Sequence, residues 1–451
     1  MLMCGIIDEL EKSAASSALI SYFFCQAADR RINSATSVLR GLIYMLVEQQ
    51  PSVVLHVRKR YDTEGRKVFE DANAWNALSE MLRDILEDAN LADTYIILDA
   101  LDECVEDMPD LLSLIAEQAT TSRRVKWLVS SRNWPDIEGV LGSTEHKTSL
   151  SLELNAVAVS EGVNIYIRHK VDQMAQRHSY DPHTKKVVLE QLSRKAEGTF
   201  LWVALVCRSL KDVKRWDVLE TLEEFPHGLD SLYQRMIEQV NNSKKAKVCK
   251  QVLATMTAVS RPVTVAELMS LVDLPDRYYN VEAVTHIIGL CASFLTIRDD
   301  EIYFVHQSAK EFLLKTSHGG YQILSNGVRH TLVKKTIHTL ASTLRRDIYR
   351  IGEFGHPVAG VKPPSPDPLA AARYACVYWV GHLCDWLSQP PPKQRVDVDR
   401  VNRMVDEFMR KKYLYWLEAL SLCGNVLQGV VLLGKLVPLI QVRSAGTYYQ
   451  L

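Results

Sequence analysis

"TYIILDALDEC", residues 94–104, is an apolar run that ends in three carboxylates, Asp99, Asp102 and Glu103. Its length and its content of isoleucine and aromatic residues predict a short β-strand. Three carboxylates so close together repel one another, so the question is which positive partner lies beside them. The stretch predicts either one half of a ligand site at the end of a strand or a solvated acidic turn.

Short apolar runs alternate with helical patterns around this stretch. Four runs have the length and the β-branched or aromatic content of strands: residues 19–25, 94–98, 125–131 and 149–154. Three helices are predicted between them, at 34–50 before Pro51, at 74–88, and at 109–119 beginning with Pro109. Strands that alternate with helices indicate a parallel sheet covered on both faces.

Helical periodicity takes over from about residue 157. One compact segment then predicts two helices, two short strands and a further helix, at 264–272, 281–290, 293–297, 301–306 and 307–317. Gly319 and Gly320 predict the end of the last helix. Helices that lead into a hairpin indicate a winged helix, but its usual DNA-binding role is disfavoured because the first two helices carry almost no Arg or Lys. The remainder is helical apart from proline-rich linkers at 355–368 and 389–395.

The composition argues against several classes of protein. The chain has 451 residues with 53 basic and 54 acidic side chains, so its charge gives no reason to expect nucleic-acid or membrane binding. Nine scattered cysteines without a C-x-x-C pair indicate reduced thiols in the cytosol and disfavour a zinc site. The most apolar late segment, residues 424–442, is interrupted by polar residues and proline, so we interpret it as a core helix rather than a membrane span.

The carboxylates of the opening stretch have the arrangement of half of a nucleotide site. In P-loop NTPases, a buried parallel strand ends in an Asp that holds the water shell of the nucleotide's magnesium, and a nearby acidic residue activates the attacking water. Asp99 stands where the first role needs it, and Glu103 or Asp102 could serve the second. The next predicted strand is followed by Arg132, which is either placed to reach a γ-phosphate or is a surface arginine.

Motifs spread over nearly the whole chain occur in a recognisable order. They include YIILDALDEC, LVSSRNWPDIE, GTFLWVALV, LEEFPHGLDSLYQRM and VHQSAKEFLL. In this order they resemble the motifs of fungal NACHT-domain NTPases, signal-transducing ATPases that are similar in plan to animal NOD-like receptors. The resemblance implies a switch that is closed with ADP, and open and oligomerising with ATP.

The resemblance also implies the fold class, an α/β P-loop NTPase-type parallel sheet followed by mostly helical domains that include a winged helix. It predicts four domains: an incomplete nucleotide-binding domain at 1–156, a helical domain at 157–243, a winged helix at 244–320 and a C-terminal helical domain at 321–451. The implied cofactor is ATP/ADP, or GTP, with Mg²⁺. The implied partners are copies of the chain or full-length relatives and an unknown effector protein, without nucleic acid or membrane.

Five residues receive roles from the resemblance. Asp99 resembles the magnesium-associated Asp of the family. Asp102 and Glu103 resemble the acidic pair that follows it, with Glu103 preferred for water activation. Arg132 resembles the sensor arginine. His306 stands where related switch ATPases have a winged-helix histidine that contacts the ADP phosphates, although it could instead cap the helix that follows it.

The phosphate-binding loop of this family, G-x-x-x-x-G-K-[S/T], is absent from the sequence. In the family it precedes a helix much like residues 1–13, so we expect the loop and its strand upstream of residue 1 and the chain to be a fragment. The similar spacing in residues 429–436 lacks the hydroxyl and a preceding strand. We expect the absent strand to lie between 94–98 and 125–131, and its loss to leave the sheet with unpaired groups.

Three functions stay open at this point. The first is a nucleotide-operated switch whose active form includes further residues. The second is a non-catalytic interaction scaffold made of the helical and winged-helix parts, and the third is an inactive truncated product. Because lysine and loop amides supply most of the stabilisation of the β- and γ-phosphates, we expect this chain to bind nucleotide poorly, and NTP hydrolysis by it stays uncertain.

Overall fold

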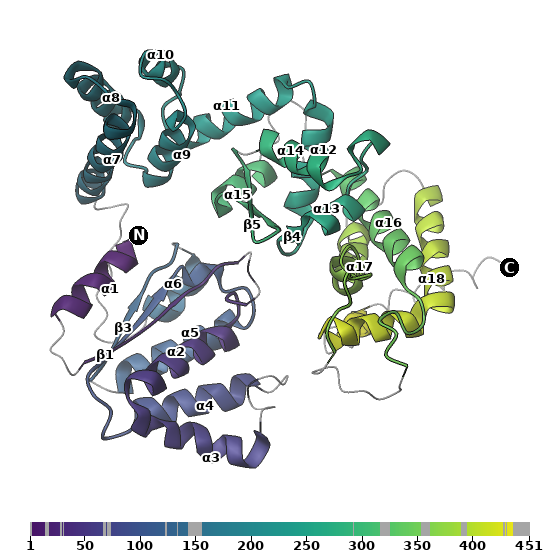
Figure 1. The fold of residues 1–451 in the computed structure, drawn as a ribbon. Helices are drawn as coiled ribbons and strands as arrows, with labels where there is room; N and C mark the ends of the chain where they lie inside the picture. Colours follow the sequence, from purple (N-terminus) through teal and green to yellow (C-terminus); the bar gives the residue numbers. More distant parts are fainter. Residues whose placement is uncertain are drawn as a thin grey trace. The chain divides into compact units, whose positions relative to one another are not determined.

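The structure, a computed structural model, describes most of the chain, in ranges with several gaps. The described residues are 2–13, 18–27, 29, 31–65, 69, 74–121, 124–132, 134–142, 156–291, 293–315, 325–352, 361–388, 395–426, 429 and 431–435. They belong to two compact units, residues 1–150 and residues 151–451. Figure 1 draws the first unit in purple and blue and the second in teal to yellow.

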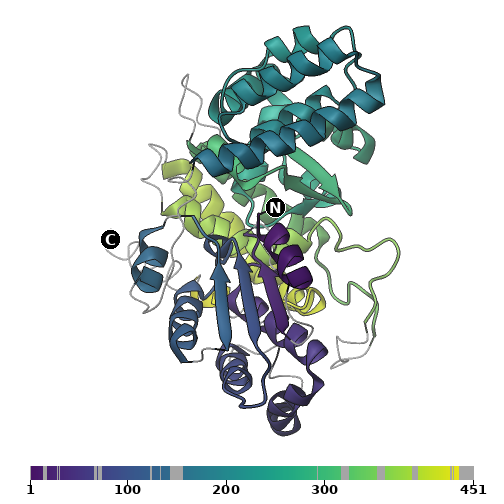
Figure 2. The ribbon, with the colours of Figure 1, turned by 90° about the vertical axis from the view of Figure 1, so that its left-hand side faces the viewer.

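A parallel sheet of three strands forms the centre of the first unit (Figure 2). The strands are β1 (Leu19–Phe24), β2 (Thr94–Asp99) and β3 (Val125–Val129), in the order β1-β2-β3. These are three of the four predicted strands, and the fourth, at 149–154, lies outside the described residues. The predicted parallel sheet is confirmed.

The prediction that an absent strand lies between β2 and β3 is wrong. The two strands pair directly, from Thr94 opposite Val125 to Leu98 opposite Val129. Each strand supplies the hydrogen-bond partners of the other, so the middle of the sheet contains no gap. Within the described residues, the edge that lacks a strand partner on this side is the outer edge of β3, where Leu128 is 37% exposed.

Alternating side chains of β1 define the layers of the first unit. Ile20 points to one face, where it packs with Met3 and Ile7 of helix α1 (Leu2–Ser13). Leu19 belongs to the core on the other face. That core contains the apolar sides of three helices, α2 (Ala35–Gln49), α4 (Ala74–Leu86) and α5 (Met108–Thr121). The sheet is therefore covered on both faces, as its continuous apolar strands predict.

Helix α2 protects the outer edge of β1. Its last residue, Gln49, accepts a hydrogen bond from the Ile20 N–H at 3.0 Å and donates one to the Ile20 carbonyl at 2.9 Å. The amide side chain thus takes the place of a strand partner. Helix α2 ends before Pro51 as predicted, and α5 begins one residue before Pro109. The other elements of the first unit are η1 (Pro51–Val53), α3 (Val54–Glu64), η3 (Leu101–Glu103) and α6 (Pro135–Gly142).

Helices make up most of the second unit. Outside the winged helix they are α7 (Ala156–His178), α8 (Pro182–Lys195), α9 (Phe200–Leu210), α10 (Val218–Glu223), α11 (Leu229–Asn242), α12 (Ala246–Ala258), α16 (Asn326–Thr343), α17 (Arg373–Leu387) and α18 (Arg395–Leu422). Their buried side chains join one hydrophobic core that extends from Val163 to Leu432. In the part of the chain that is described, every helix is too short or too polar to cross a membrane. The predicted core helix at 424–442 lies largely outside the described residues.

The predicted winged helix is confirmed within the second unit. It consists of β4 (Val263–Thr264), α13 (Val265–Leu271), η4 (Asp276–Tyr278), α14 (Val281–Leu290), β5 (Leu295–Arg298), β6 (Glu301–Phe304) and α15 (Gln307–Lys315). Its antiparallel sheet has the order β4-β6-β5. The hairpin turns at Asp299 and Asp300, whose φ angles of 49° and 67° are left-handed values that Asp tolerates. The predicted helix end at Gly319 and Gly320 lies outside the described residues.

Candidate functional site

Asp99, Asp102 and Glu103, here called the acidic corner, lie at the carboxyl ends of the parallel strands. Asp99 is the last residue of β2, while Cys25 and Ser130 directly follow β1 and β3. Open α/β sheets bind their ligands at this edge. The sheet therefore brings the three carboxylates together with the residues that end the neighbouring strands.

Ser130 fixes the first carboxylate. Its hydroxyl donates a short hydrogen bond to Asp99 Oδ1 and accepts one from the Ala100 N–H at 2.9 Å. Its backbone N–H donates to the Leu98 carbonyl and its carbonyl accepts from the Leu101 N–H, both at 2.9 Å. Ala100 has φ 54°, a conformation that a residue with a side chain keeps only when its surroundings hold it. Ser130 thus positions the Asp99 carboxylate, and the only signal for it in the sequence is its place near the end of the predicted strand 125–131.

Arg132 is the positive partner of the acidic corner. Its Nε donates to Asp102 Oδ2 at 2.5 Å and its backbone N–H donates to Oδ1 at 3.0 Å. The Asp102 side chain is 4% exposed and that of Arg132 is 45% exposed. The guanidinium also lies over the ring of Trp134, 5.2 Å from its centroid. A buried carboxylate needs such a counter-ion, so Asp102 is committed to an ion pair, and Asp99 and Glu103 are better placed to contact a ligand.

Glu103 is held from the side of β1. Its Oε2 accepts a hydrogen bond from the Ala27 N–H at 3.0 Å. The loops that follow β1 and β2 are joined again where the Val105 N–H donates to the Asn33 carbonyl at 2.7 Å. The half-buried Glu103 carboxylate therefore has a defined direction and is not part of a freely solvated turn.

Two buried thiols, Cys25 and Cys104, lie beside the acidic corner. A hydrogen bond between them raises the pKa of Cys25, and burial and the charges of Glu103 and Asp99 raise it further. Cys25 is therefore a protonated thiol at neutral pH. Because the thiolate is the nucleophilic form, Cys25 is unsuited to nucleophilic catalysis.

The acidic corner is not a complete metal site by itself. Within the described residues, no group of three or more His, Cys, Asp or Glu side chains could hold a metal ion. Mg²⁺ keeps much of its water shell, however, and needs only one or two carboxylates when nucleotide phosphates supply other ligands. The oxygen ligands present fit the outer shell of a nucleotide-bound magnesium and do not fit an isolated ion.

His306, the fifth predicted site residue, belongs to the second unit and is exposed. Its Nδ1 accepts a hydrogen bond from the Ser308 N–H at 3.1 Å and lies 2.8 Å from the Ser308 hydroxyl. It thus satisfies the Ser308 N–H at the start of α15, which is the capping alternative that the sequence left open. The contact with ADP phosphates stays a prediction.

Comparisons with known proteins cover both units. Residues 1–132 match the family model described as Nephrocystin 3, N-terminal, and residues 233–322 match that of the GPI inositol-deacylase winged helix domain. The chain is 47% identical over 446 residues to the vegetative incompatibility protein HET-E-1 of Podospora anserina. It is a relative of the fungal NACHT-type P-loop NTPases. The alignment covers 95% of this chain and 33% of HET-E-1, so the chain spans about a third of the length of its curated relative.

Among solved structures, the Walker-type ATPase PABY2304 of Pyrococcus abyssi gives a TM-score of 0.25 at 10% identity, over 68% of the present chain and 93% of the ATPase. The winged-helix match is more informative, because residues 233–322 contain β4, β5, β6 and helices α13 to α15. The four predicted domain boundaries stay predictions.

Proposed function

We propose that the chain is part of a nucleotide-operated signalling switch, in which the acidic corner is the magnesium-binding and water-activating half of the nucleotide site. One observation carries this proposal. Two carboxylates, Asp99 and Glu103, are oriented by Ser130 and Ala27 at the carboxyl edge of a parallel sheet. Asp99 would hold the water shell of Mg²⁺ and Glu103 would activate the attacking water. Similarity to HET-E-1 supports a role in signalling, and the process in that protein's name is likewise only a proposal for this chain.

The remaining predicted residues have supporting roles in this proposal. Arg132 would contact the γ-phosphate with the exposed part of its guanidinium while Nε keeps its bond to Asp102. His306 would contact the phosphates of ADP in the closed state. When bound, ATP with magnesium would supply the reacting phosphate, and ADP would mark the closed state. The sequence contains no G-x-x-x-x-G-K-[S/T] loop, so we expect this chain alone to bind nucleotide weakly.

Manganese can test the role of Asp99, because Mn²⁺ replaces Mg²⁺ at such sites and its binding is measured by electron paramagnetic resonance. At millimolar ATP, we expect the chain to bind one Mn²⁺ more tightly than free ATP does, and Asp99→Asn to remove that gain. Asp110→Asn, which changes an exposed carboxylate on α5, is the matched control and should bind like the unchanged chain. Equal Mn²⁺ affinity for Asp99→Asn and Asp110→Asn would contradict the proposal.

A fluorescent ATP analogue tests the expected weak nucleotide binding. It should show no saturable binding at micromolar concentrations, and tight binding would contradict the expectation.

An interaction scaffold without catalysis is the second candidate function. Its support is that the second unit has a core of its own, from Val163 to Leu432, and does not depend on a nucleotide site. We propose copies of the chain, full-length relatives and an effector protein as partners, and the cytosol as the location, because all nine cysteines are free thiols. Nucleic acid is a poor candidate, since α14 contains no Arg or Lys.

Light scattering distinguishes the candidate functions. Association that depends on Mg²⁺ and ATP favours the switch, association without them favours the scaffold, and neither favours an inactive product.

A further inference from the structure

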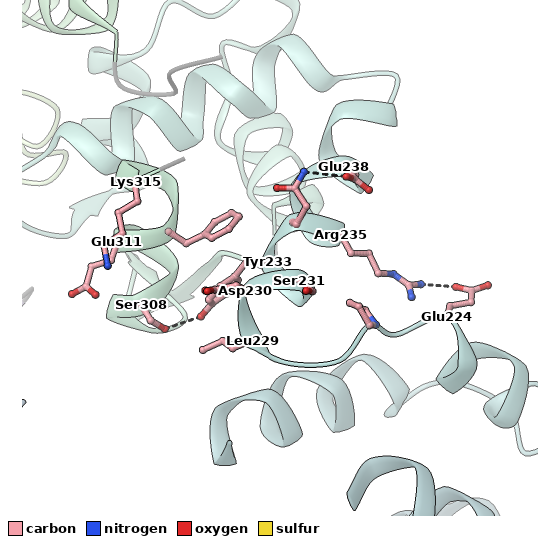
Figure 3. Close-up of a pocket in the computed structure, with 13 residues that line it drawn as sticks. Glu224, Leu229, Asp230, Ser231, Tyr233, Arg235, Glu238, Ser308, Glu311 and Lys315 are labelled. Carbon is pink, nitrogen blue, oxygen red and sulfur yellow. Dashed lines mark hydrogen bonds and ion pairs between the residues drawn. The ribbon is translucent and has the colours of Figure 1, made fainter. Parts of the chain in front are cut away.

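The second unit contains a cavity of about 820 Å³ between α11 and α15 (Figure 3). Its polar side chains are largely committed to one another. The contacts drawn there join Tyr233 to Ser308, Arg235 to Glu224 and Gln234 to Glu238. The reactive groups that the proposed functions leave unused lie elsewhere in this unit and are cysteine thiols.

Cys376 and Cys423 bring two thiols together in the C-terminal helices. Cys376 lies near the start of α17 and is fully buried, and Cys423 directly follows the last residue of α18 and is partly exposed. Both are free thiols, and a hydrogen bond joins them. The two sulfur atoms are therefore neighbours in the folded chain.

Contacts between α17 and α18 hold Cys376 in place. Trp416 Nε1 donates to the Cys376 carbonyl at 2.8 Å, and the rings of Trp379 and Trp416 pack edge to face with centroids 5.6 Å apart. All three residues are fully buried. The backbone around Cys376 therefore stays against α18 as long as this packing is intact.

The end of α18 fixes the position of Cys423. Gly424 has a φ of 68° and ends the helix in the left-handed conformation. Its N–H donates to the Ser421 carbonyl and the Asn425 N–H donates to the Leu420 carbonyl, both at 2.9 Å. These are the two hydrogen bonds of a Schellman motif in which Cys423 is the C-cap. Cys423 therefore belongs to an ordered helix end and not to a loose loop.

Hydrogen bonding and charge make the two thiols unequal. The hydrogen bond from Cys376 lowers the pKa of Cys423, and the positive charge of Arg373 acts in the same direction, against the opposing effect of burial. The same hydrogen bond raises the pKa of Cys376. The Arg373 guanidinium is itself fixed, because it donates to Asp367 at 2.7 and 3.0 Å and to the Tyr349 hydroxyl at 2.8 Å. Cys423 is therefore the thiol that more readily becomes a thiolate, and Cys376 is the one that stays protonated.

Two other hydrogen-bonded thiol pairs show what distinguishes this one. All four of their thiols are buried, Cys25 with Cys104 and Cys249 with Cys291. In the three pairs, Cys423 alone is partly open to solvent. Partial exposure, a lowered pKa and a second thiol in contact are the properties of cysteines that react with peroxides.

We propose that Cys376 and Cys423 are a peroxide-sensitive pair that forms a disulfide between the start of α17 and the end of α18. The Cys423 thiolate attacks one oxygen of hydrogen peroxide, so that an S–O bond forms, the O–O bond breaks and the released hydroxide takes up a proton to leave as water. The Cys376 sulfur then attacks the resulting sulfenic acid. The S–S bond forms, the S–O bond breaks, and the Cys376 proton leaves with the hydroxyl group as a second water.

Both sulfur atoms are oxidised in this sequence, and one hydrogen peroxide is reduced to two waters. A dithiol reductant reverses the reaction by thiol–disulfide exchange. The disulfide would lock α17 to the end of α18 under oxidising conditions and release it under reducing ones. The proposal does not depend on nucleotide binding.

Mass spectrometry of the full chain gives the first test and needs no variant. The reduced chain is treated with a small molar excess of hydrogen peroxide, denatured, alkylated at its free thiols and digested without reductant. We expect a pair of crosslinked peptides that contains Cys376 and Cys423, lighter by two hydrogen atoms than the separate peptides and absent after treatment with dithiothreitol. Recovery of Cys376 and Cys423 as alkylated thiols would overturn the proposal, whether or not other cysteines are oxidised.

Thermal unfolding gives the second test, because a disulfide constrains the unfolded chain. We expect peroxide to raise the melting temperature of the second unit by about 5–10 °C, and dithiothreitol to reverse the rise. Cys423→Ser should abolish the rise. Cys384→Ser, which removes another partly exposed thiol of α17, is the matched control and should keep it. Equal responses of the two variants to peroxide would contradict the proposal.

Cys376→Ala separates the two chemical steps. The sulfenic acid on Cys423 then has no neighbouring thiol to attack it, so a dimedone probe should label Cys423 more strongly in this variant than in the unchanged chain. Labelling of Cys384 in place of Cys423 would show that Cys423 is not the thiol that reacts with peroxide and would overturn the proposal.

Discussion

Each carboxylate of the acidic corner has its own donor; two of the donors follow β3 and the third follows β1. Ser130 holds Asp99, Arg132 holds Asp102 and the Ala27 N–H holds Glu103. These hydrogen bonds and the ion pair therefore offset the repulsion between the three carboxylates without a bound ligand. Asp102 and Arg132 stand thirty positions apart, and their meeting depends on the register of β2 and β3, which no local sequence pattern encodes.

Ser130→Ala should destabilise the first unit. The change removes a hydrogen bond to Asp99 and leaves the Ala100 N–H without its acceptor, so the free energy of unfolding should fall by about 1–2 kcal/mol. Urea denaturation measures this. Ser130→Thr keeps the hydroxyl and should restore most of the loss. Ser131→Ala removes an exposed hydroxyl that bonds only to the Arg132 carbonyl, and should change stability by less than about 0.5 kcal/mol. Equal effects of the two alanine variants would contradict the positioning role of Ser130.

His382 should make the second unit less stable in acid. Burial, together with a smaller effect of the nearby charge of Arg329, lowers its pKa to about 4. Its Nε2 lies 2.7 Å from the Tyr374 hydroxyl. The pKa of His382 in the folded state is below its value of about 6.5 in the unfolded state. Between pH 4 and pH 6.5 the unfolded state therefore binds more protons than the folded state. The neutral His382 contributes about 3 kcal/mol to the free energy of unfolding above about pH 6.5, and this contribution is lost as the pH falls towards 4.

The pH dependence of urea unfolding checks this prediction. His382→Gln removes the titrating group, so its stability should change less between pH 7 and pH 4.5 than that of the unchanged chain. His286→Gln, on the exposed side of α14, is the matched control and should keep the original slope. A slope that is the same in all three proteins would show that His382 is not the group responsible.

At the scale of elements, Lys195 joins three helices. It is the last residue of α8, it is buried, and its Nζ donates to the carbonyls that end α10 and precede α11. Burial lowers the pKa of Lys195, yet three carbonyls solvate the ammonium group. In the sequence this lysine stands in a helical pattern with charged neighbours, where a surface position is the ordinary expectation. Only the path of the chain between α10 and α11 reveals its role.

Lys195→Met should therefore be costly despite similar side-chain size. It removes the three hydrogen bonds that Lys195 Nζ donates to buried carbonyls, and we expect the free energy of unfolding to fall by about 3 kcal/mol. Arg194→Met changes the adjacent exposed cation and should cost less than about 0.5 kcal/mol. Thermal unfolding followed by circular dichroism compares the two, and similar losses would argue against the three hydrogen bonds as the cause.

The sequence predicts best those elements whose structure is determined by residues within or next to them. Short apolar runs with β-branched or aromatic content locate β1, β2 and β3, and proline places the end of α2. The order of strands in a sheet is not determined by nearby residues. The prediction of a further strand between β2 and β3 was wrong for this reason. The candidate site shows the same division. The strand end places Asp99, whereas Ser130 and the commitment of Asp102 to Arg132 depend on contacts across the sheet.

At the scale of the whole molecule, the second unit has a shared core and not a series of separate ones. The winged helix and the C-terminal helices are joined by hydrogen bonds from the Ser260 N–H to the Tyr374 hydroxyl at 3.0 Å and from the Ser270 hydroxyl to the Ala371 carbonyl at 2.9 Å. Buried residues of α12, α13, α16 and α17 belong to the same hydrophobic cluster. Helices that share one hydrophobic core in this way unfold together in a cooperative transition.

A fragment of residues 156–435 should therefore fold without the first unit and melt in one cooperative transition. A shorter fragment, 156–315, keeps the winged helix but loses α16 to α18, which exposes apolar residues such as Val252 and Leu268 that are buried in the shared core. We expect it to be less helical per residue and to melt broadly, as followed by circular dichroism and calorimetry. If the shorter fragment melts as sharply as the longer one, the winged helix is an independent domain and the C-terminal helices are an addition to it. A single sharp transition only in 156–435 supports one cooperative unit, the form that an interaction scaffold requires.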